Sequence, residues 1–150
     1  MPVPAVWGPI LWSLLHSIGA RAGTSPPKMY IDEMRELKWM FDHLESIVPC
    51  KECRDHIQKY KKLNPPPFGA SGQLQLWVWQ FHEEVNARLE KPSTTPFTPD
   101  LGKPTNNAKL LETWKTYNDV LRDSLLTGSV KGDNMKEFSR HFRLWIGFTS

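Results

Sequence analysis

The sequence predicts an all-α protein built on a four-helix bundle, with additional C-terminal helices. Apolar residues recur at spacings of three and four in several segments, which is the period of an amphipathic helix. No segment suggests a convincing strand pair, and no internal repeat or low-complexity array interrupts the pattern. The chain has 150 residues, of which 39% are hydrophobic, so it can form one domain with a real core.

The first expected helix begins near Gly8 and Pro9, where a proline costs little, and ends in the stretch GARAGTSPP. Two lines of residues follow its helical period. One is an apolar stripe formed by Leu11, Leu14, Leu15 and Ile18. The other runs in steps of four along a different face and consists of Gly8, Trp12, His16 and Ala20.

A second helix is expected to be capped by Ser25, with Pro26 in its first turn, and to be broken by Pro49. Spacings of four and three along it predict one bundle-type seam over about five turns. The seam residues are Tyr30, Met34, Leu37, Phe41, Leu44 and Val48.

A third helix is expected to start at the cysteine pair and to run to about Lys62, before the loop LNPPPFGASG. A fourth covers roughly residues 72–90, and His82 and Asn86 lie one turn apart beside its apolar face. The residues that can face a core are Leu74, Trp77, Val78, Phe81, Val85 and Leu89.

The Pro-rich connector KPSTTPFTPDLGKPTNN separates this bundle from the rest of the chain. We therefore expect a bundle domain over residues 1–98 and a C-terminal helical extension over residues 99–150, packed on the bundle. A fifth helix is marked by Leu110, Trp114, Tyr117, Leu121 and Leu125. A sixth begins with the cap pair Asn134 and Glu137. Its stripe consists of Met135, Phe138, Phe142 and Trp145.

The composition argues against several classes of protein. A formal net charge of +3 is too mild for a nucleic-acid-binding stripe. No apolar stretch reaches the length of a membrane span, and the N-terminal MPVPAVWGPILW lacks the basic region and cleavage site of a signal peptide. Two cysteines are too few for a secreted disulfide scaffold. We therefore expect a cytoplasmic protein that is not secreted and binds neither nucleic acid nor a membrane.

The stretch VPCKECRDH contains both cysteines, Cys50 and Cys53, and has three interpretations. With His56 the pair could supply three zinc ligands, although a structural site needs a fourth. The cysteines could also be two buried thiols without a function. The third interpretation is a redox pair, because Pro49 places the cysteines in the first turn of the next helix. A helix N-terminus favours a thiolate and lowers the pKa of a thiol.

Three segments, in this order and spacing, together resemble the Erv/ALR family of FAD-linked sulfhydryl oxidases. WGPILWSLLH is similar to the family's opening helix, and PCKEC is similar to its redox disulfide at a helix start. WVWQFHEEVNARLEKP is similar to the family's most specific motif, W-x4-HNxVNxxLxKP. The outer two segments match at Gly8, Trp12, Leu15, His16, Trp77, His82, Val85, Asn86, Leu89, Lys91 and Pro92. The resemblance covers about residues 7–92 and is closest to compact members from large DNA viruses.

Some positions depart from the family pattern. Glu83 stands where the family usually has asparagine, and Pro9 stands where cellular members often have arginine. Val48 replaces an aromatic residue found in many cellular members. These departures concern particular flavin contacts and not the pocket as a whole. After about residue 95 the match is poor, and Trp114 is the candidate for the family's late aromatic flavin contact.

The resemblance implies a bundle that binds FAD and an enzyme that oxidises thiols with O2, releasing H2O2. Substrate thiolates would attack Cys50 of a Cys50–Cys53 disulfide, and Cys53 would pass the electron pair to the flavin. The implied partners are protein thiols, with a thioredoxin-like redox protein as one candidate, together with O2 and a second copy in a homodimer. If the chain is viral, its place is the host cytoplasm or the virion. The implied cofactor-binding residues, with no metal among the ligands, are Gly8, Trp12, His16, Trp77, His82, Val85, Asn86, Leu89, Lys91 and Trp114.

From the residues alone, simpler interpretations stay open. Trp12 would then be a core tryptophan, His16 a satisfied core or surface histidine, and Asn86 and Lys91 solvated helix residues. For the whole chain, one alternative is a helical zinc-stabilised interaction module that uses Cys50, Cys53 and His56. Another is a bare helical scaffold. A yellow, FAD-containing protein would distinguish the oxidase from both.

Overall fold

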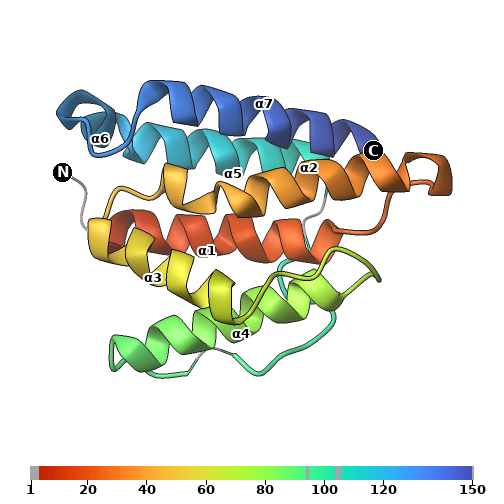
Figure 1. Cartoon of the computed structure of the whole chain (residues 1–150), viewed down its shortest axis with the longest axis horizontal. Helices are drawn as coiled ribbons and strands as arrows, with labels where there is room; N and C mark the ends of the chain where they lie inside the picture. The colour runs from red at the N-terminus through yellow and green to blue at the C-terminus, as the bar shows by residue number, and fades with distance from the viewer. Residues whose placement is uncertain (1–3, 94, 104–105, 150) are drawn as a thin grey trace.

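The computed structural model describes residues 4–93, 95–103 and 106–149, and every regular element in these ranges is a helix (Figure 1). This confirms the predicted all-α class. None of the described helices is long and apolar enough to cross a bilayer. The α-helices are α1 (Pro4–Arg21), α2 (Tyr30–Asp42), α3 (Lys51–Leu63), α4 (Gln73–Arg88), α5 (Asn107–Val120), α6 (Arg122–Thr127) and α7 (Gly132–Phe148). Two short 3-10 helices are η1 (Pro27–Met29) and η2 (Leu44–Ile47).

Helix α1 begins earlier than predicted, at Pro4, so that Pro9 lies inside the helix and not at its start. A proline at position 9 cannot donate a hydrogen bond to the carbonyl of Ala5. Ala5 is exposed in the first turn, where water can supply the missing donor. Pro4 takes the first helical position, where the fixed φ of proline favours a helix.

The start of α2 also differs from the prediction, because Ser25 does not cap it. The 3-10 helix η1 comes first, and α2 follows from Tyr30 with no side-chain cap. The backbone N–H of Ser25 instead donates to the buried carboxylate of Glu33, at 3.3 Å. Glu33 also accepts from the Gly23 N–H and the Trp145 indole N–H, each at 2.9 Å. Glu33 therefore organises the turn between α1 and α2 and connects it to α7.

The predicted seam of the second helix is divided between α2 and η2. Helix α2 ends at Asp42, where the Lys61 ammonium of α3 donates to the carbonyls of Phe41 and Asp42 at 2.8 and 3.1 Å. These bonds satisfy carbonyls that have no partner within the helix. The seam still faces the core, since its buried members are Leu37, Phe41, Leu44 and Val48.

Helices α1 and α4 approach each other closely at Gly19. A Cβ atom on Gly19 would lie 2.9 Å from the Cα of Gln75, so a larger residue would push the two backbones apart. The Gln75 side chain donates to the carbonyls of Pro99 and Leu101 at 2.9 and 2.8 Å and holds the Pro-rich connector against α4. The position of α4 relative to α1 is thereby fixed, and these two helices form facing walls of the candidate site.

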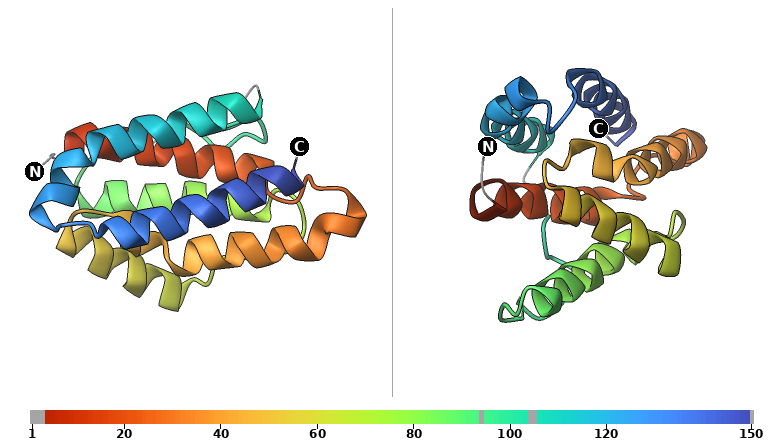
Figure 2. Two further views of the ribbon diagram at one scale, coloured as in Figure 1. Left: turned by 90° about the horizontal axis from the view of Figure 1, so that it is seen from above. Right: turned by 60° about the vertical axis from the view of Figure 1, so that its left-hand side comes forward.

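The C-terminal helices cover α1 and α2. Figures 1 and 2 show α5 and α7 on one side of these two helices, and α4 on the other side of α1. Trp114 of α5 stacks on Phe138 and Phe142 of α7, with ring centroids 5.3 and 5.6 Å apart. Buried residues from before and after the connector form one hydrophobic cluster. A division of the chain after residue 98 stays a prediction.

Two expectations for the C-terminal segment are wrong. Helix α7 begins at Gly132 with no side-chain cap, so Asn134 does not cap it. Glu137 pairs with Arg140 on the exposed surface, at 3.0 Å. Leu125 belongs to the separate helix α6, because α5 ends at Val120. The predicted stripe of α7 is buried along its whole length, at Met135, Phe138, Phe142 and Trp145.

Candidate active site

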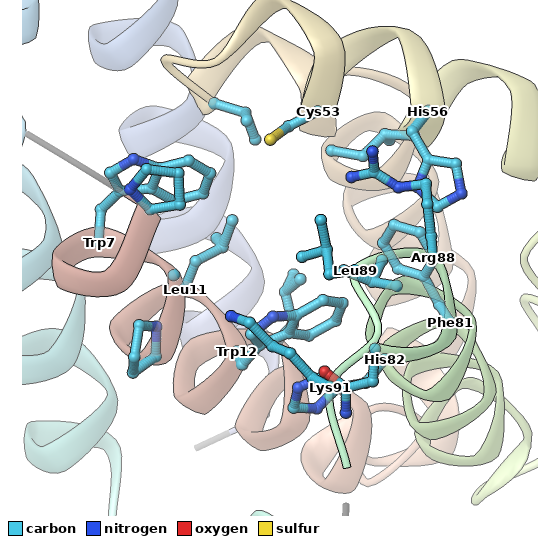
Figure 3. Close-up of a pocket in the computed structure, with 18 of the residues that line it drawn as sticks. Trp7, Leu11, Trp12, Cys53, His56, Phe81, His82, Arg88, Leu89 and Lys91 are labelled. Atoms are coloured by element: carbon cyan, nitrogen blue, oxygen red, sulfur yellow. The ribbon is translucent and has the colours of Figure 1, made fainter. Parts of the chain in front are cut away.

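A cavity of about 520 Å³ opens between α1, α3 and α4 (Figure 3). Most of its wall is apolar, with a few polar groups among the apolar side chains, as in sites for organic cofactors. Figure 3 shows Cys53 at one end and His82 and Lys91 at the other. The lining residues are Pro4, Ala5, Trp7, Gly8, Pro9, Leu11, Trp12, Ser13, Leu15, His16, Leu44, Val48, Cys53, His56, Ile57, Phe81, His82, Val85, Asn86, Arg88, Leu89 and Lys91.

The line of residues predicted on α1 faces this pocket. Gly8, Trp12 and His16 follow one another in steps of four and all line the cavity. A Cβ atom on Gly8 would meet no other atom within 4 Å, so this glycine borders open space. The helical period predicted that these residues share one face, and the resemblance to the family indicated that this face belongs to a site; in the structure the face lines the cavity.

His82 of α4 completes a group of rings with Trp12 and His16. The Trp12 and His82 rings stack with centroids 3.9 Å apart and planes inclined by 9°. The Nε2 atom of His16 and the Nδ1 atom of His82 are 3.0 Å apart, so one of them carries the proton of the hydrogen bond. The Nδ1 atom of His16 is buried without a hydrogen-bond partner. A bare acceptor costs less there than an N–H, so we assign the shared proton to His16 Nε2, which leaves the His82 Nε2–H free to donate.

Both histidines are neutral at pH 7. Burial lowers the pKa of His82 to about 4, and the nearby charges of His16 and Lys91 act in the same direction. Glu83 opposes this shift but is outweighed. Burial also lowers the pKa of His16. The wall formed by Trp12 and the two histidines is therefore polar but uncharged.

We expect the protein to lose stability on acidification from about pH 6.5 to about pH 4. The pKa of His82 is about 4 in the folded protein against an ordinary value of 6.5. Between these values the unfolded chain binds a proton that the folded chain does not, so the free energy of unfolding decreases as the pH is lowered. Above pH 6.5 this contribution to stability is fully retained. Melting temperatures recorded across this range should fall less steeply for His82→Gln. If the melting temperatures of the wild type and His82→Gln fall equally steeply with decreasing pH, His82 is not the group that causes the loss of stability.

The C-terminal end of α4 brings Lys91 back to the pocket through a strained turn. Glu90 has a φ of 56°, a left-handed backbone conformation that residues other than glycine rarely adopt. The Lys91 N–H donates to the Asn86 carbonyl at 2.8 Å, and the Glu90 N–H donates to the Ala87 carbonyl at 3.2 Å. These are the two hydrogen bonds of a Schellman motif. Val85, Asn86 and Leu89 of the predicted set line the pocket beside this turn, as does Lys91.

The two cysteines occupy different places relative to the pocket. Both are half-buried free thiols in this structure. Cys50 is the N-cap of α3, and its sulfur accepts a hydrogen bond from the Cys53 N–H at 3.3 Å. Cys53 is among the described residues that line the cavity, whereas Cys50 is not. Cys53 therefore faces the cavity, and Cys50 lies outside its lining.

The pKa of Cys53 differs from the expectation. Burial, then the hydrogen bond and charge of Cys50, raise the pKa of Cys53 to about 12. Arg88 acts in the opposite direction through its charge and a hydrogen bond. The lowered pKa expected from the helix N-terminus is therefore wrong for Cys53 in the dithiol state, because burial disfavours the thiolate and the neighbouring Cys50 adds to this effect.

Arg88, His56, Phe81 and Trp7 line the pocket, although none of them was predicted from the sequence to bind a cofactor. Figure 3 shows Arg88 near His56, on the side of the pocket towards Cys53. A basic residue at a helix end looks like a solvated one, so composition gives no signal for Arg88. A signal does exist in the spacing, because residues 81, 85 and 88 follow the four-three period that places side chains on one helix face.

Two predicted cofactor residues lie away from the cavity. The indole N–H of Trp77 donates to the Asn64 carbonyl at 2.8 Å, and its buried ring packs beside Phe81. The indole N–H of Trp114 donates to the Ser139 hydroxyl at 3.0 Å within the layer formed by α5 and α7. Neither side chain is among the residues lining the pocket. Trp77 supports the wall from behind, and Trp114 belongs to the C-terminal core.

The zinc alternative finds no support. Within the described ranges, no group of three or more His, Cys, Asp or Glu side chains is arranged to hold a metal ion. His56 lies beside the ring of Phe81, with ring centroids 6.2 Å apart. The three residues of the alternative therefore do not form a closed ligand set.

The chain is similar to proteins of known activity. The family described as the Erv1 / Alr family matches residues 9–115. A "FAD-linked sulfhydryl oxidase" of African swine fever virus is 33% identical over 120 residues, which is 80% of this chain and 83% of the viral protein.

Cellular and other viral proteins show similar identity over a shorter span. The "Mitochondrial FAD-linked sulfhydryl oxidase ERV1" of Saccharomyces cerevisiae is 33% identical over 81 residues, which is 54% of this chain and 41% of the yeast protein. A "Putative FAD-linked sulfhydryl oxidase 096R" of Invertebrate iridescent virus 3 is 31% identical over 91 residues, which is 59% of this chain and 60% of the viral protein. No solved structure matches the chain.

Proposed function

Because the chain belongs to the Erv1 / Alr family, we propose that it is an FAD-dependent sulfhydryl oxidase that converts pairs of thiols into disulfides and reduces O2 to H2O2. One observation carries this proposal beyond the family match. Cys53 of a C-x-x-C pair lines an apolar cavity whose other end presents neutral polar rings and a lysine. This arrangement supports a redox role for Cys53 beside a cofactor held by the same cavity.

The residues of the cavity fit FAD. Apolar side chains of α1 and α3 surround the Cys53 end and suit a flat aromatic ring system. At the other end, the His82 Nε2–H and the Asn86 amide can bond to the nucleotide, and Lys91 can pair with the pyrophosphate. The unpartnered Nδ1 atom of His16 gives a further acceptor. We infer that these residues, with Gly8, Trp12, Val85 and Leu89, hold the cofactor.

The chain's own residues carry out the exchange of thiols. A substrate thiolate attacks the sulfur of Cys50, forms a mixed disulfide and releases Cys53 as a thiolate. A second substrate thiolate then attacks the substrate sulfur, so that the substrate disulfide leaves and both cysteines are reduced. Bound FAD would supply the two-electron chemistry by which the Cys50–Cys53 dithiol is oxidised back to the disulfide at the expense of O2. Two thiols and one O2 thereby give one disulfide and one H2O2.

The lining of the cavity supports different roles for the two cysteines in this exchange. Cys53, which lines the cavity, would be the inner sulfur at the cofactor end. Cys50, which is half-buried and outside the lining, would be the outer sulfur that a substrate reaches. Arg88 favours the Cys53 thiolate, although burial and Cys50 hold the pKa of the Cys53 thiol high in the dithiol. We infer that Arg88 stabilises the charge that Cys53 acquires when the disulfide opens.

The substrates are protein thiols, and we propose a thioredoxin-like redox protein as the partner. These 150 residues contain two cysteines, so no third cysteine in them can relay electrons to the pair. A partner that exchanges with these residues alone would reach Cys50 directly. The viral relatives support action in a host cytoplasm or in a virion. We also propose a homodimer, and its contacts would have to spare the faces of α1 and α2 that α5 and α7 cover.

We expect Trp12→Ala and His82→Ala to weaken FAD retention by at least about tenfold each, because each removes one ring of the stacked pair. Loss of FAD should also lower the melting temperature, since a ligand that binds only the folded state stabilises it. The measurement is the flavin absorbance per protein after dialysis, with FAD titration of the stripped protein.

Trp79→Ala is the matched control. Trp79 lies on α4 but outside the pocket lining, and its indole N–H donates to the Thr95 carbonyl at 2.9 Å. This variant should keep its flavin. If the Trp12 and His82 variants also remain fully flavinated, this cavity is not the FAD site. A wild-type protein without flavin that cannot be reconstituted would overturn the proposed function itself.

A further inference from the structure

The segment that delivers the cysteines is extended, and its carbonyls are held by side chains from other elements. Between η2 and α3, Val48 has φ −107° and ψ 121°, and Cys50 has φ −103° and ψ 120°. Pro49 between them has no N–H to donate. The carbonyls of Ile47 and Val48 therefore depend on partners elsewhere in the molecule.

Tyr117 of α5 supplies the first of these partners. Its hydroxyl donates to the Ile47 carbonyl at 2.6 Å, and both residues are fully buried. Burial, together with the negative charge that Cys53 can carry, raises the pKa of Tyr117. The hydroxyl therefore keeps its proton and stays a donor. Tyr117 also lies just beyond residues 9–115, the part of the chain that matches the family.

Arg54 supplies the second partner. Its Nη1 atom donates to the Val48 carbonyl at 2.8 Å and to the Ser129 carbonyl at 3.3 Å. Ser129 lies between α6 and α7, so this guanidinium joins the cysteine segment to the C-terminal helices. The segment before Cys50 is thus connected to those helices by two independent routes.

We propose that Tyr117 and Arg54 are positioning residues that fix the segment before Cys50, so that the C-terminal helices set the thiol–disulfide equilibrium of the Cys50–Cys53 pair. The proposal rests on the redox role proposed above. Cys53 is fixed within α3, whereas Cys50 precedes the helix and takes its position from this segment. Freeing the segment lets the two sulfurs separate and lowers the effective concentration of one thiol at the other.

The test measures the equilibrium of the full-length flavoprotein with a glutathione buffer in the absence of O2. In this exchange the protein disulfide and two glutathione thiols give the protein dithiol and glutathione disulfide. Free thiols are trapped by alkylation, and the fractions of reduced and oxidised protein are quantified by mass spectrometry. We expect Tyr117→Phe to lower the equilibrium constant for disulfide formation by about tenfold, which corresponds to about 30 mV. Arg54→Gln should shift the equilibrium constant in the same direction, and this variant tests the proposal if Tyr117→Phe does not fold.

Ser139→Ala is the matched control, because it removes the hydrogen bond between α7 and Trp114 of α5 without touching the cysteine segment. It should lower the melting temperature and leave the equilibrium constant unchanged. The inference is overturned if folded Tyr117→Phe and Arg54→Gln stay within about twofold of the wild type. An equal shift in Ser139→Ala also overturns it, by showing a general effect of loosened packing. A wild-type protein that forms no disulfide at any glutathione ratio contradicts the proposed function as well.

Discussion

Cys53→Ser is expected to reduce thiol oxidase turnover by at least about a thousandfold while leaving FAD bound. Without Cys53 no internal disulfide can form, and an electron pair has no route from a substrate to the cofactor. Cys53 is one of many residues that line the pocket, so the pocket should keep its shape when one sulfur is replaced by oxygen. The measurement is H2O2 formation with a small dithiol, together with the flavin absorbance of the purified variant.

Cys50→Ser separates the roles of the two cysteines. It should also abolish turnover, but it retains the inner sulfur beside the flavin. Because Cys50 contributes two of the causes that raise the pKa of Cys53, this variant should ionise Cys53 at a lower pH and develop a long-wavelength charge-transfer band. Glu52→Ser, an exposed position between the cysteines, is the control and should keep normal activity. Full activity in Cys53→Ser would exclude the proposed mechanism.

A chain ending at residue 98 is expected not to fold cooperatively. It would lose the Trp145 donor of the buried Glu33 carboxylate and the Tyr117 donor of the Ile47 carbonyl. The buried Ile47 carbonyl would lose its hydroxyl donor, which costs about 1–3 kcal/mol, and the buried Glu33 carboxylate would keep only the N–H donors of Gly23 and Ser25. The apolar faces of α1 and α2 would be uncovered as well. The sum approaches the total stability of a small domain. Urea unfolding followed by circular dichroism should show no sharp transition.

A nicked protein provides the control for this truncation. A protease site between Pro92 and Ser93, both exposed, would cut the chain after folding. The two pieces should remain associated on gel filtration, because the contacts between α1, α2, α5 and α7 do not depend on the connector. A stable, flavin-binding fragment of residues 1–98 would contradict this expectation and support two separable domains.

The sequence was informative where a repeating pattern met a chemical requirement. A helix puts residues four apart on one face, and the resemblance to the family indicated that the faces of Gly8 to His16 and of His82 to Lys91 belong to a site. Both faces line the pocket. The third helix begins where Pro49 and the cysteines predict it. These features are local, so one segment is enough to determine them.

The errors concern features that depend on distant contacts. Ser25 looks like a helix cap, but its buried hydroxyl has no hydrogen-bond partner, its N–H donates to the distant Glu33, and the 3-10 helix η1 precedes α2. Arg88 looks like a solvated end residue until α3 brings Cys53 and His56 next to it. The pKa of Cys53 rises because the thiol is buried in the folded protein, which a helix position cannot reveal. Tertiary packing decides each of these cases.

The inward orientation of Arg54 has a consequence for the kinetics of encounter with a protein substrate. With this guanidinium committed to backbone carbonyls, the exposed charges next to Cys50 are the Lys51–Asp55 pair, at 3.0 Å, and Glu52. Lys51 and Asp55 cancel each other at longer range, and the half-buried charge of Arg54 offsets that of Glu52, so the group exerts little pull on an approaching partner. Association at this end should therefore proceed without strong electrostatic steering and vary little with ionic strength. Selection among partners would then depend on how long a docked thiol stays beside Cys50, and thus on dissociation rates more than on capture.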